Sequence, residues 1–361
     1  MTKDSPLSGT RKQLRVLVVD NSATQRGMLI NLLESDQELK VAGWAANGKE
    51  AIKCAELLKP DVITMEFRMP VMDGLQATQR IMQQTPIPIV MVTTSSSSNT
   101  EQIVFAAIQA GVMATVAMPM PGSQYAQGVQ ELLRTVKSMA EIKLVRRWTP
   151  ERIRALTSES AVPVVASSNR ALEIVAIGAS TGGPPVLQQI LTQLPAAFTL
   201  PVLVVQHIAA DFVTTFVDWL RPQCRLPVQI AGDGVSLSRP GIYFAPQGQH
   251  LRVYKQTLAL TSEPPIRGHR PSVTALFESV ATYYGKAAIG VLLTGMGDDG
   301  AIGMHGLKKA GALTVAQDEA SSVVFSMPAL AIDMGVVDYV LPPPAIATLL
   351  VNLAGLDKGA S

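Results

Sequence analysis

Short apolar runs alternate with longer, helix-periodic stretches over residues 14–135. The runs that predict strands are Leu14–Val19, Val41–Ala46, Asp61–Met65, Ile87–Val92 and Ala114–Ala117. The stretches that predict helices are Thr24–Leu33, Lys49–Leu58, Gly74–Gln83, Glu101–Ala110 and Tyr125–Lys143. Strands that alternate regularly with helices are typical of an α/β fold with a doubly wound parallel sheet, so we expect a (βα)5 domain here.

The periodicity is lost between Lys143 and Arg170. This stretch begins with Arg146-Arg147-Trp148 and continues with Ser, Pro and Val residues in no regular order. Such a composition is typical of an interdomain linker. We therefore predict an N-terminal domain over residues 12–137, a linker over residues 138–170 and a C-terminal domain over residues 171–355.

The second domain again combines strand and helix patterns. Apolar runs that end at Gly178, Gln206 and Thr294 predict strands. Helices are predicted over Val186–Leu191, Ser272–Tyr284 and Ala301–Ala310, and further strands over Leu313–Ala316 and Val337–Leu341. Residues 228–262 are predicted to be an antiparallel section, because Gly241–Ala245 and Leu251–Tyr254 flank a loop. We expect a second α/β domain with a mostly parallel sheet.

Composition narrows the class of protein. The chain has 361 residues, of which 47% are hydrophobic and 16% charged, so it can build sizeable cores. The net charge of +2 does not indicate a nucleic-acid or anionic-membrane partner, and two distant cysteines indicate neither a disulfide framework nor a metal site. The polar N-terminus is not a signal peptide, and no apolar run approaches the roughly 20 residues of a membrane helix. We expect a cytoplasmic protein.

A glycine-rich turn joins the first strand of the second domain to a helix. Its sequence is Gly178-Ala179-Ser180-Thr181-Gly182-Gly183. A serine in such a turn is exposed at the edge of the sheet, and the N–H groups of the helix start can hold an oxyanion. Glycine-rich turns at this place also bind phosphate, so the turn alone leaves a nucleophile and a phosphate loop both open.

Two more polar positions follow strand ends in this domain. His207 follows the second strand, and Asp298 and Asp299 follow the third. Because the carboxyl ends of parallel strands share one edge, a hydroxyl, a base and a carboxylate can meet there. Among the four histidines, His207 has the best position for a base. The other three, His250, His269 and His305, are interpreted as surface or packing residues.

The order of these residues along the chain excludes the α/β-hydrolase fold. An α/β-hydrolase has its acidic residue between serine and histidine, whereas here the aspartates come last. The glycine spacing is not Gly-x-Gly-x-x-Gly, and the next strand ends in Gln206-His207 instead of an acidic residue. A dinucleotide site is therefore not expected either.

Several separated motifs are similar to those of the chemotaxis protein-glutamate methylesterases. They are residues 177–183, 205–207, 269–273 and 293–300, extended by residues 316–320 and by Met327-Pro328. The resemblance implies hydrolysis of glutamate γ-methyl esters, and deamidation of certain glutamines, on the cytoplasmic helices of methyl-accepting receptors. It implies no metal and no organic cofactor for catalysis.

The same resemblance assigns roles to particular residues. Ser180 is implied to be the nucleophile, His207 the base, and Asp299 the residue that orients the base. Thr181 and Met296 occupy the positions that line the oxyanion region, Met296 through its backbone N–H.

The first domain resembles a response-regulator receiver, but departs from it at the phosphorylation pocket. A receiver needs an acidic pair for Mg²⁺, an aspartate acceptor, a hydroxyl and a lysine. The matching positions hold Asp20 and Asn21, Glu66, Thr93 and Met118. Three of them lack the expected side chain. We hypothesise that this pocket is not phosphorylated in the ordinary way, and Mg²⁺ binding is in doubt.

Two questions stay open at this point. Glu66 could mimic the phosphorylated state, or the domain could be a fixed docking or dimerisation module. The spare carboxylate nearby, Asp73, is interpreted as a structural loop residue.

The leading function is a receptor methylesterase. The alternatives are a catalytically inactive or differently targeted receptor-binding regulator of the same fold, and a hydrolase that acts on another acyl substrate. A histidine kinase of a chemosensory system could be a partner.

Overall fold

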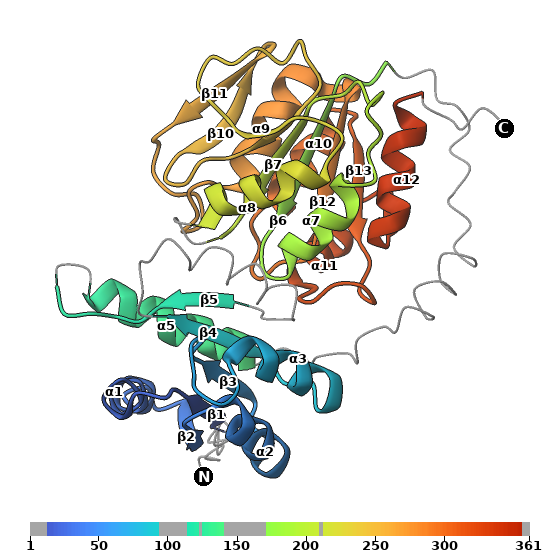
Figure 1. The fold of residues 1–361 in the computed structure, drawn as a ribbon. Coiled ribbons are helices and arrows are strands. Elements are labelled where there is room, and N and C mark those ends of the chain that lie inside the picture. The colour runs from blue at the N-terminus through green and yellow to red at the C-terminus, as the bar shows by residue number, and fades with distance from the viewer. Residues whose placement is uncertain (1–12, 94–113, 123–124, 141–170, 209–211, 356–361) are drawn as a thin grey trace, which may run out of the picture. The chain divides into compact units, whose positions relative to one another are not determined.

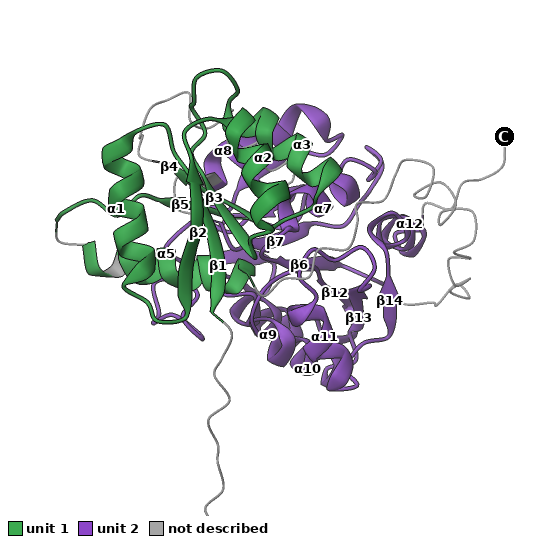
Figure 2. Ribbon diagram, turned by 90° about the horizontal axis from the view of Figure 1, so that it is seen from below, with its two compact units in different colours: residues 1–146 green, residues 147–361 purple. Residues whose placement is uncertain are grey.

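The computed structural model of this chain describes residues 13–93, 114–122, 125–140, 171–208 and 212–355 (Figure 1). The chain forms two compact units, residues 1–146 and 147–361 (Figure 2). Most of the predicted linker, residues 138–170, lies outside the described residues, so the predicted domain boundaries stay predictions. Each unit is built on a parallel sheet of its own.

The first unit has a five-stranded parallel sheet in the order β2-β1-β3-β4-β5. Its strands are β1 (Leu14–Val19), β2 (Leu39–Ala45), β3 (Val62–Met65), β4 (Ile89–Thr93) and β5 (Ala114–Ala117). The described helices are α1 (Ala23–Glu34), α2 (Gly48–Leu58), α3 (Gly74–Gln84) and α5 (Tyr125–Ala140). This arrangement confirms the predicted doubly wound sheet. The helix predicted over Glu101–Ala110 falls outside the described residues.

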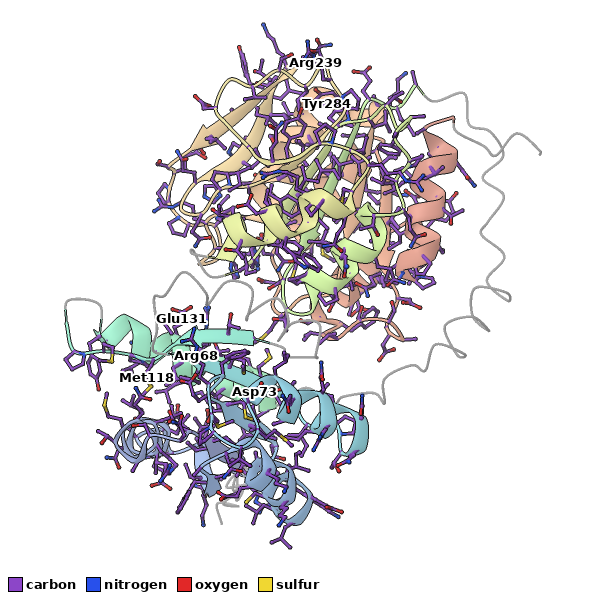
Figure 3. All side chains as sticks on the ribbon, viewed as in Figure 1. Arg68, Asp73, Met118, Glu131, Arg239 and Tyr284 are labelled. Atoms are coloured by element: carbon purple, nitrogen blue, oxygen red, sulfur yellow. The ribbon has the colours of Figure 1, made fainter. Side chains whose placement is uncertain are left out.

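Polar caps begin the helices that follow the first three strands. Ser22, Asn47 and Asp73 are the N-caps of α1, α2 and α3, and each side chain accepts a hydrogen bond from the first turn. Asp73 accepts from the backbone N–H of Gln76 at 2.8 Å and also lies near its side chain (Figure 3). Its carboxylate therefore has the structural role expected of a loop residue.

The second unit has a seven-stranded sheet in the order β14-β13-β12-β6-β7-β9-β8, in which every pair is parallel. Its strands are β6 (Ile174–Ala179), β7 (Val202–Gln206), β8 (Val228–Ile230), β9 (Ile242–Phe244), β12 (Ala288–Leu292), β13 (Leu313–Gln317) and β14 (Tyr339–Leu341). Its α-helices are α7 (Gly183–Leu191), α8 (Phe212–Leu220), α9 (Val273–Tyr284), α10 (Ala301–Lys309), α11 (Ser326–Asp333) and α12 (Pro343–Leu353).

The prediction of an antiparallel section over residues 228–262 is wrong for its first half. Only β10 (His250–Tyr254) and β11 (Thr257–Thr261) are antiparallel, and they form a separate two-stranded sheet. β8 and β9 instead extend the parallel sheet. Residues 242–244 are buried on both faces, as is typical of interior parallel strands. Their apolar run predicts a strand but carries no information about the direction of its partner.

The three central strands β6, β7 and β12 are buried over their whole length. On one face of the sheet, Ile174 and Ala176 of β6 share a core with Phe277 of α9 and Met304 of α10. Alternate strand residues face the opposite layer, as the two-residue period of a strand requires. The packed layers fix the carboxyl ends of these three strands side by side, and the candidate site lies there.

Candidate active site

Ser180 lies in the turn between β6 and α7 but is buried, with 8% of its surface exposed, so the prediction of an exposed serine at the sheet edge is wrong. Its N–H donates to the Thr294 carbonyl at 3.0 Å, and its own carbonyl accepts from the N–H of Gly183 at 2.9 Å. Gly182 has a φ of 78°, which favours glycine. A Cβ atom at Gly183 would lie 2.0 Å from Oε1 of Gln206. The tight turn therefore depends on both glycines.

Strand register brings His207 next to this turn. In the β6–β7 pair, Ala179 is the partner of Gln206, so Ser180 and His207 each follow a paired residue. The N–H of His207 donates to the Ala179 carbonyl at 3.0 Å, which continues the pairing by one residue. The His207 side chain is 11% exposed. The strand-end rule thus places a mostly buried imidazole beside the turn that carries the hydroxyl.

Asp299 contacts the imidazole of His207. Atom Nε2 of His207 lies 3.0 Å from Oδ2 of Asp299, within ion-pair distance when the ring is protonated. The N–H is not aligned along this contact, so the hydrogen bond is not fully formed. Catalytic hydrogen bonds are often poorly aligned without substrate. Atom Nδ1 is buried and has no hydrogen-bond partner within the described ranges.

The carboxylate of Asp299 is held at the N-terminus of α9. It is fully buried and accepts hydrogen bonds from the hydroxyl of Ser272, the N-cap of this helix, and from the N–H groups of Val273 and Thr274, at 2.7–3.0 Å. Helix N-termini stabilise negative charge. Burial raises the pKa of the Asp299 carboxyl, but the contact with the His207 ring and the hydrogen bonds from Thr274 outweigh burial and hold this pKa well below its usual range.

His269 also lies at the site, although its pattern predicts a surface or packing residue. Its ring stacks on that of His207, with centroids 4.1 Å apart and planes within 3°. The loop that carries His269 is tied to the Asp299 loop through an ion pair between Arg267 and Asp298. Arg270 donates to backbone carbonyls of its own region and thereby shapes the same loop.

The other two histidines, His250 and His305, are a buried and an exposed side chain respectively. His250 is fully buried; its Nδ1 accepts from the N–H of Ser272, and its Nε2 lies 3.2 Å from the Pro264 carbonyl. These two contacts require a neutral ring with the proton on Nε2. His305 is exposed on α10.

The backbone segment of Met296 runs directly against Ser180. A Cβ atom at the preceding residue, Gly295, would lie 2.8 Å from Cβ of Ser180 and 2.1 Å from Sδ of Met327. Only glycine fits at this close approach. Thr181, which follows Ser180, is half-buried, and its carbonyl accepts from the Thr294 hydroxyl at 2.9 Å. The two segments implied for the oxyanion region thus border the same hydroxyl.

Two known domain families match parts of this chain. Residues 175–350 match the CheB methylesterase family, and residues 16–130 match the response regulator receiver domain. "Protein-glutamate methylesterase/protein-glutamine glutaminase 1" of Syntrophus aciditrophicus is 43% identical over 346 residues, which cover 95% of this chain and 99% of that protein. This chain belongs to the CheB methylesterase family.

A second relative is similar over most of the chain, and one solved structure is similar over half of it. "Protein-glutamate methylesterase/protein-glutamine glutaminase 4" of Geobacter metallireducens is 43% identical over 349 residues, which cover 94% of this chain and 99% of that protein. The crystal structure of the Thermotoga maritima CheB methylesterase catalytic domain is 35% identical and covers 50% of this chain and 98% of that chain, with a TM-score of 0.48.

The structure also places residues at the positions that the sequence matches to a receiver pocket. Asp20 is buried, and Asn21 is exposed on the chain beside it. Oε1 of Glu66 accepts from the N–H of Phe67 at 2.6 Å and from the N–H of Arg68 at 3.2 Å, so this carboxylate is folded onto its own loop. Met118, which directly follows β5 and is labelled in Figure 3, is buried. Thr93 ends β4, and its side chain is outside the description.

The pKa values of the two acidic side chains of this pocket, Asp20 and Glu66, are both raised. Burial raises the pKa of the Glu66 carboxyl against the opposing hydrogen bonds from Arg68 and Phe67, and nearby Asp20 raises it further. Burial also raises the pKa of Asp20, against a hydrogen bond from Ser22 and the charge of Arg26. The pocket therefore disfavours two ionised carboxylates.

Two negative observations apply to the described parts of the chain. Within them, no three His, Cys, Asp or Glu side chains are grouped so that they could hold a metal ion. None of the helices placed there is long and apolar enough to cross a membrane.

Proposed function

We propose that this chain is a protein-glutamate methylesterase and protein-glutamine glutaminase that uses Ser180, His207 and Asp299. The observation that carries the proposal is the position of His207, which lies beside the Ser180 turn and 3.0 Å from a buried, anionic Asp299. The names of the relatives state both activities. The substrate is the γ-methyl ester of glutamate, or the side chain of glutamine, on cytoplasmic helices of methyl-accepting receptors.

The mechanism follows from these three groups. The hydroxyl of Ser180 attacks the ester carbonyl while His207 takes its proton, and backbone N–H groups stabilise the tetrahedral oxyanion. The proton on His207 passes to the departing methoxide, which leaves as methanol. Water then attacks the acyl-enzyme while His207 takes its proton, and a second tetrahedral intermediate forms. When this intermediate collapses, Ser180 regains its proton from His207 and the glutamate carboxylate is released. In deamidation, ammonia leaves in place of methanol.

Asp299 has an electrostatic role in this scheme. Its pKa lies well below its usual range, so it is ionised at any pH at which the enzyme works. Its carboxylate stabilises the imidazolium that His207 becomes in both steps. Because serine, imidazole and carboxylate supply the nucleophile, the base and the counter-charge, the proposed reaction requires neither a metal nor an organic cofactor.

Methanol release from a methylated receptor tests the proposed function. The full-length chain should release methanol, and Ser180→Ala should lower the turnover by a factor on the order of 10⁴. An active Ser180→Ala variant would show that another residue is the nucleophile. A wild-type chain that binds the receptor but releases no methanol would instead support the inactive regulator.

We further infer that the receiver is not switched by ordinary phosphorylation. The contacts of Glu66 support a fixed module over a mimic of the phosphorylated state, because its Oε1 is taken up by two N–H groups of its own loop. Met118 offers no charge to a phosphoryl group. The residues present fit Mg²⁺ poorly, since Asn21 replaces a hard anionic ligand and burial disfavours two charged carboxylates.

A small phosphodonor with Mg²⁺ tests the inference about the receiver. We expect no added phosphoryl mass and an unchanged esterase rate. A phosphorylated chain with a raised esterase rate would contradict it and would restore a histidine kinase as a direct phosphoryl-donating partner.

A further inference from the structure

The direction of a backbone N–H group is set by the carbonyl that shares its peptide plane. In a trans peptide the two point in opposite directions. The N–H of Thr181 therefore points away from whatever holds the Ser180 carbonyl, and the N–H of Met296 points away from whatever holds the Gly295 carbonyl. Both peptide groups border Ser180, so their orientation decides where hydrogen-bond donors face an oxyanion.

The Ser180 carbonyl is held by the side chain of Gln206. Atom Nε2 of Gln206 donates to it at 2.8 Å and donates equally to the His207 carbonyl at 2.8 Å. Both partners are acceptors, so the amide must present its NH₂ group to them. One buried side chain thus joins the nucleophile turn to the backbone of the base.

Gln206 makes this connection at a cost. It is 4% exposed, and its Oε1 is buried without a hydrogen-bond partner in the described structure. An unsatisfied buried acceptor destabilises the folded state. Packing alone would favour an apolar side chain of the same length, such as methionine. The amide supplies two hydrogen bonds to backbone carbonyls that a methionine could not donate.

A second side chain holds the other peptide group in the same way. The hydroxyl of Ser326 donates to the Gly295 carbonyl at 2.9 Å, and the N–H of Met327 donates to that carbonyl at 3.2 Å. Ser326 also accepts from the N–H of Gly297 at 3.1 Å. These bonds fix the peptide planes on both sides of Met296.

The two N–H groups opposite these carbonyls are available to a ligand. Within the described residues, neither the N–H of Thr181 nor that of Met296 donates a hydrogen bond. The carbonyls of the same two peptide groups, those of Ser180 and Gly295, each accept two hydrogen bonds. Two oriented and unused N–H groups beside a nucleophilic hydroxyl are the arrangement that stabilises a tetrahedral oxyanion.

We propose that Gln206 and Ser326 are positioning residues, which orient the N–H groups of Thr181 and Met296 toward the oxyanion by holding the carbonyls of the preceding residues. The proposal rests on the proposed esterase function. Neither side chain touches the substrate in this scheme. Gln206 acts through the Ser180–Thr181 peptide, and Ser326 acts through the Gly295–Met296 peptide.

Substitution of Gln206 tests the first half of the proposal. Gln206→Met keeps the length of the side chain but removes the donor, so kcat should fall by about 10- to 100-fold, with little change in KM, because removal of one oxyanion donor costs about 10²–10³. Gln206→Glu presents an oxygen to two carbonyls and should lower kcat further. Gln193→Met, at an exposed position of the same domain, is the matched control and should leave kcat unchanged.

Substitution of Ser326 tests the second half. Ser326→Ala should lower kcat by about 3- to 10-fold, because this hydroxyl is exposed and water replaces part of its hydrogen bonding. Ser326→Thr keeps the hydroxyl and should restore the rate. Thermal unfolding of every variant, measured in parallel, reports whether the fold is intact.

A second readout separates positioning from general damage. A short alkylboronic acid forms a tetrahedral anionic adduct with a serine hydroxyl, so its affinity should weaken in parallel with kcat across the variants. Unchanged boronic-acid affinity in Gln206→Met and Ser326→Ala, or full kcat in both, would overturn the proposal. A wild-type chain that binds the boronic acid but releases no methanol would refute the esterase function alone, and the affinities of the variants would still decide the positioning role.

Discussion

The imidazole rings of His207 and His269 lie face to face, with centroids 4.1 Å apart and planes within 3°. His207 has Asp299 at its edge and His269 on its face, so two sides of the ring are fixed. A ring that must exchange a proton in two successive steps benefits from a fixed plane, because the transfer depends on alignment.

His269→Ala should lower kcat/KM by about 2- to 10-fold. Stacked aromatic pairs contribute about 0.5–1.5 kcal/mol, and about 1.4 kcal/mol corresponds to a tenfold change in rate. His269→Phe keeps a flat ring and should retain most of the activity, whereas His305→Ala, on the exposed side of α10, should have no effect. Equal losses in His269→Ala and His269→Phe would mean that His269 contributes its nitrogen atoms and not its stacking face.

Asp299→Asn should destabilise the second unit at neutral pH, and the difference should shrink as the pH falls. The folded pKa of Asp299 is lowered, so its stabilising contribution is present above the unfolded pKa of about 3.9 and is lost as the pH falls through the folded value. Urea midpoints at pH 7, 5 and 3 measure the effect.

The neighbouring carboxylate supplies the control for this measurement. Asp298 pairs with Arg267 in a half-exposed ion pair, and such pairs contribute about 0–1 kcal/mol. Asp298→Asn should therefore change the urea midpoint little at any pH. A difference between wild type and Asp299→Asn that grows toward pH 3 would contradict the lowered pKa.

The pattern of polar residues at strand ends is enough to predict that Ser180, His207 and Asp299 lie at one edge of the sheet. This succeeds because the carboxyl ends of parallel strands share an edge whatever the loops do, and because Ala179 and Gln206 are register partners. The direction of β9 was not predictable in the same way. A short apolar run is equally compatible with parallel and antiparallel neighbours, and only packing in the whole sheet decides between them.

The sequence pattern does not predict the contacts that loops make. His269 follows no strand, and its stacking depends on a loop that returns to the site before α9. The three donors around Asp299 belong to the start of that helix. The motif at residues 269–273 includes His269 and two of these three donors, but a motif records which residues recur together and not which atoms they contact.

Gly295→Ala should lower kcat by about 10²-fold. It should lower the free energy of unfolding by less than the equivalent of this change in rate. The new methyl group would lie 2.8 Å from Cβ of Ser180, so the nucleophile must shift, and misplacement by about 1 Å can cost that much in rate. Gly306→Ala is the matched control, because nothing lies within 4 Å of its added methyl group and alanine favours the helix interior. Equal activity in Gly295→Ala and Gly306→Ala would contradict the close approach.

Glu66→Gln should stabilise the first unit at pH 7 by a few degrees in Tm and have little effect near pH 4. The folded pKa of Glu66 is raised, chiefly by burial, so the wild-type unit loses stability as the pH rises from the unfolded value of about 4.3 through the folded value. Glutamine does not ionise, and its Oε1 can still accept from the N–H groups of Phe67 and Arg68. Scanning calorimetry of the full-length chain at the two pH values measures the difference.

Glu131→Gln, at an exposed position of α5, is the control and should shift Tm equally little at both pH values. A Glu66→Gln chain that is less stable than wild type at pH 7 would show that the charge of Glu66 has a stabilising partner, and the pocket would then be a working anionic site and not an inert one.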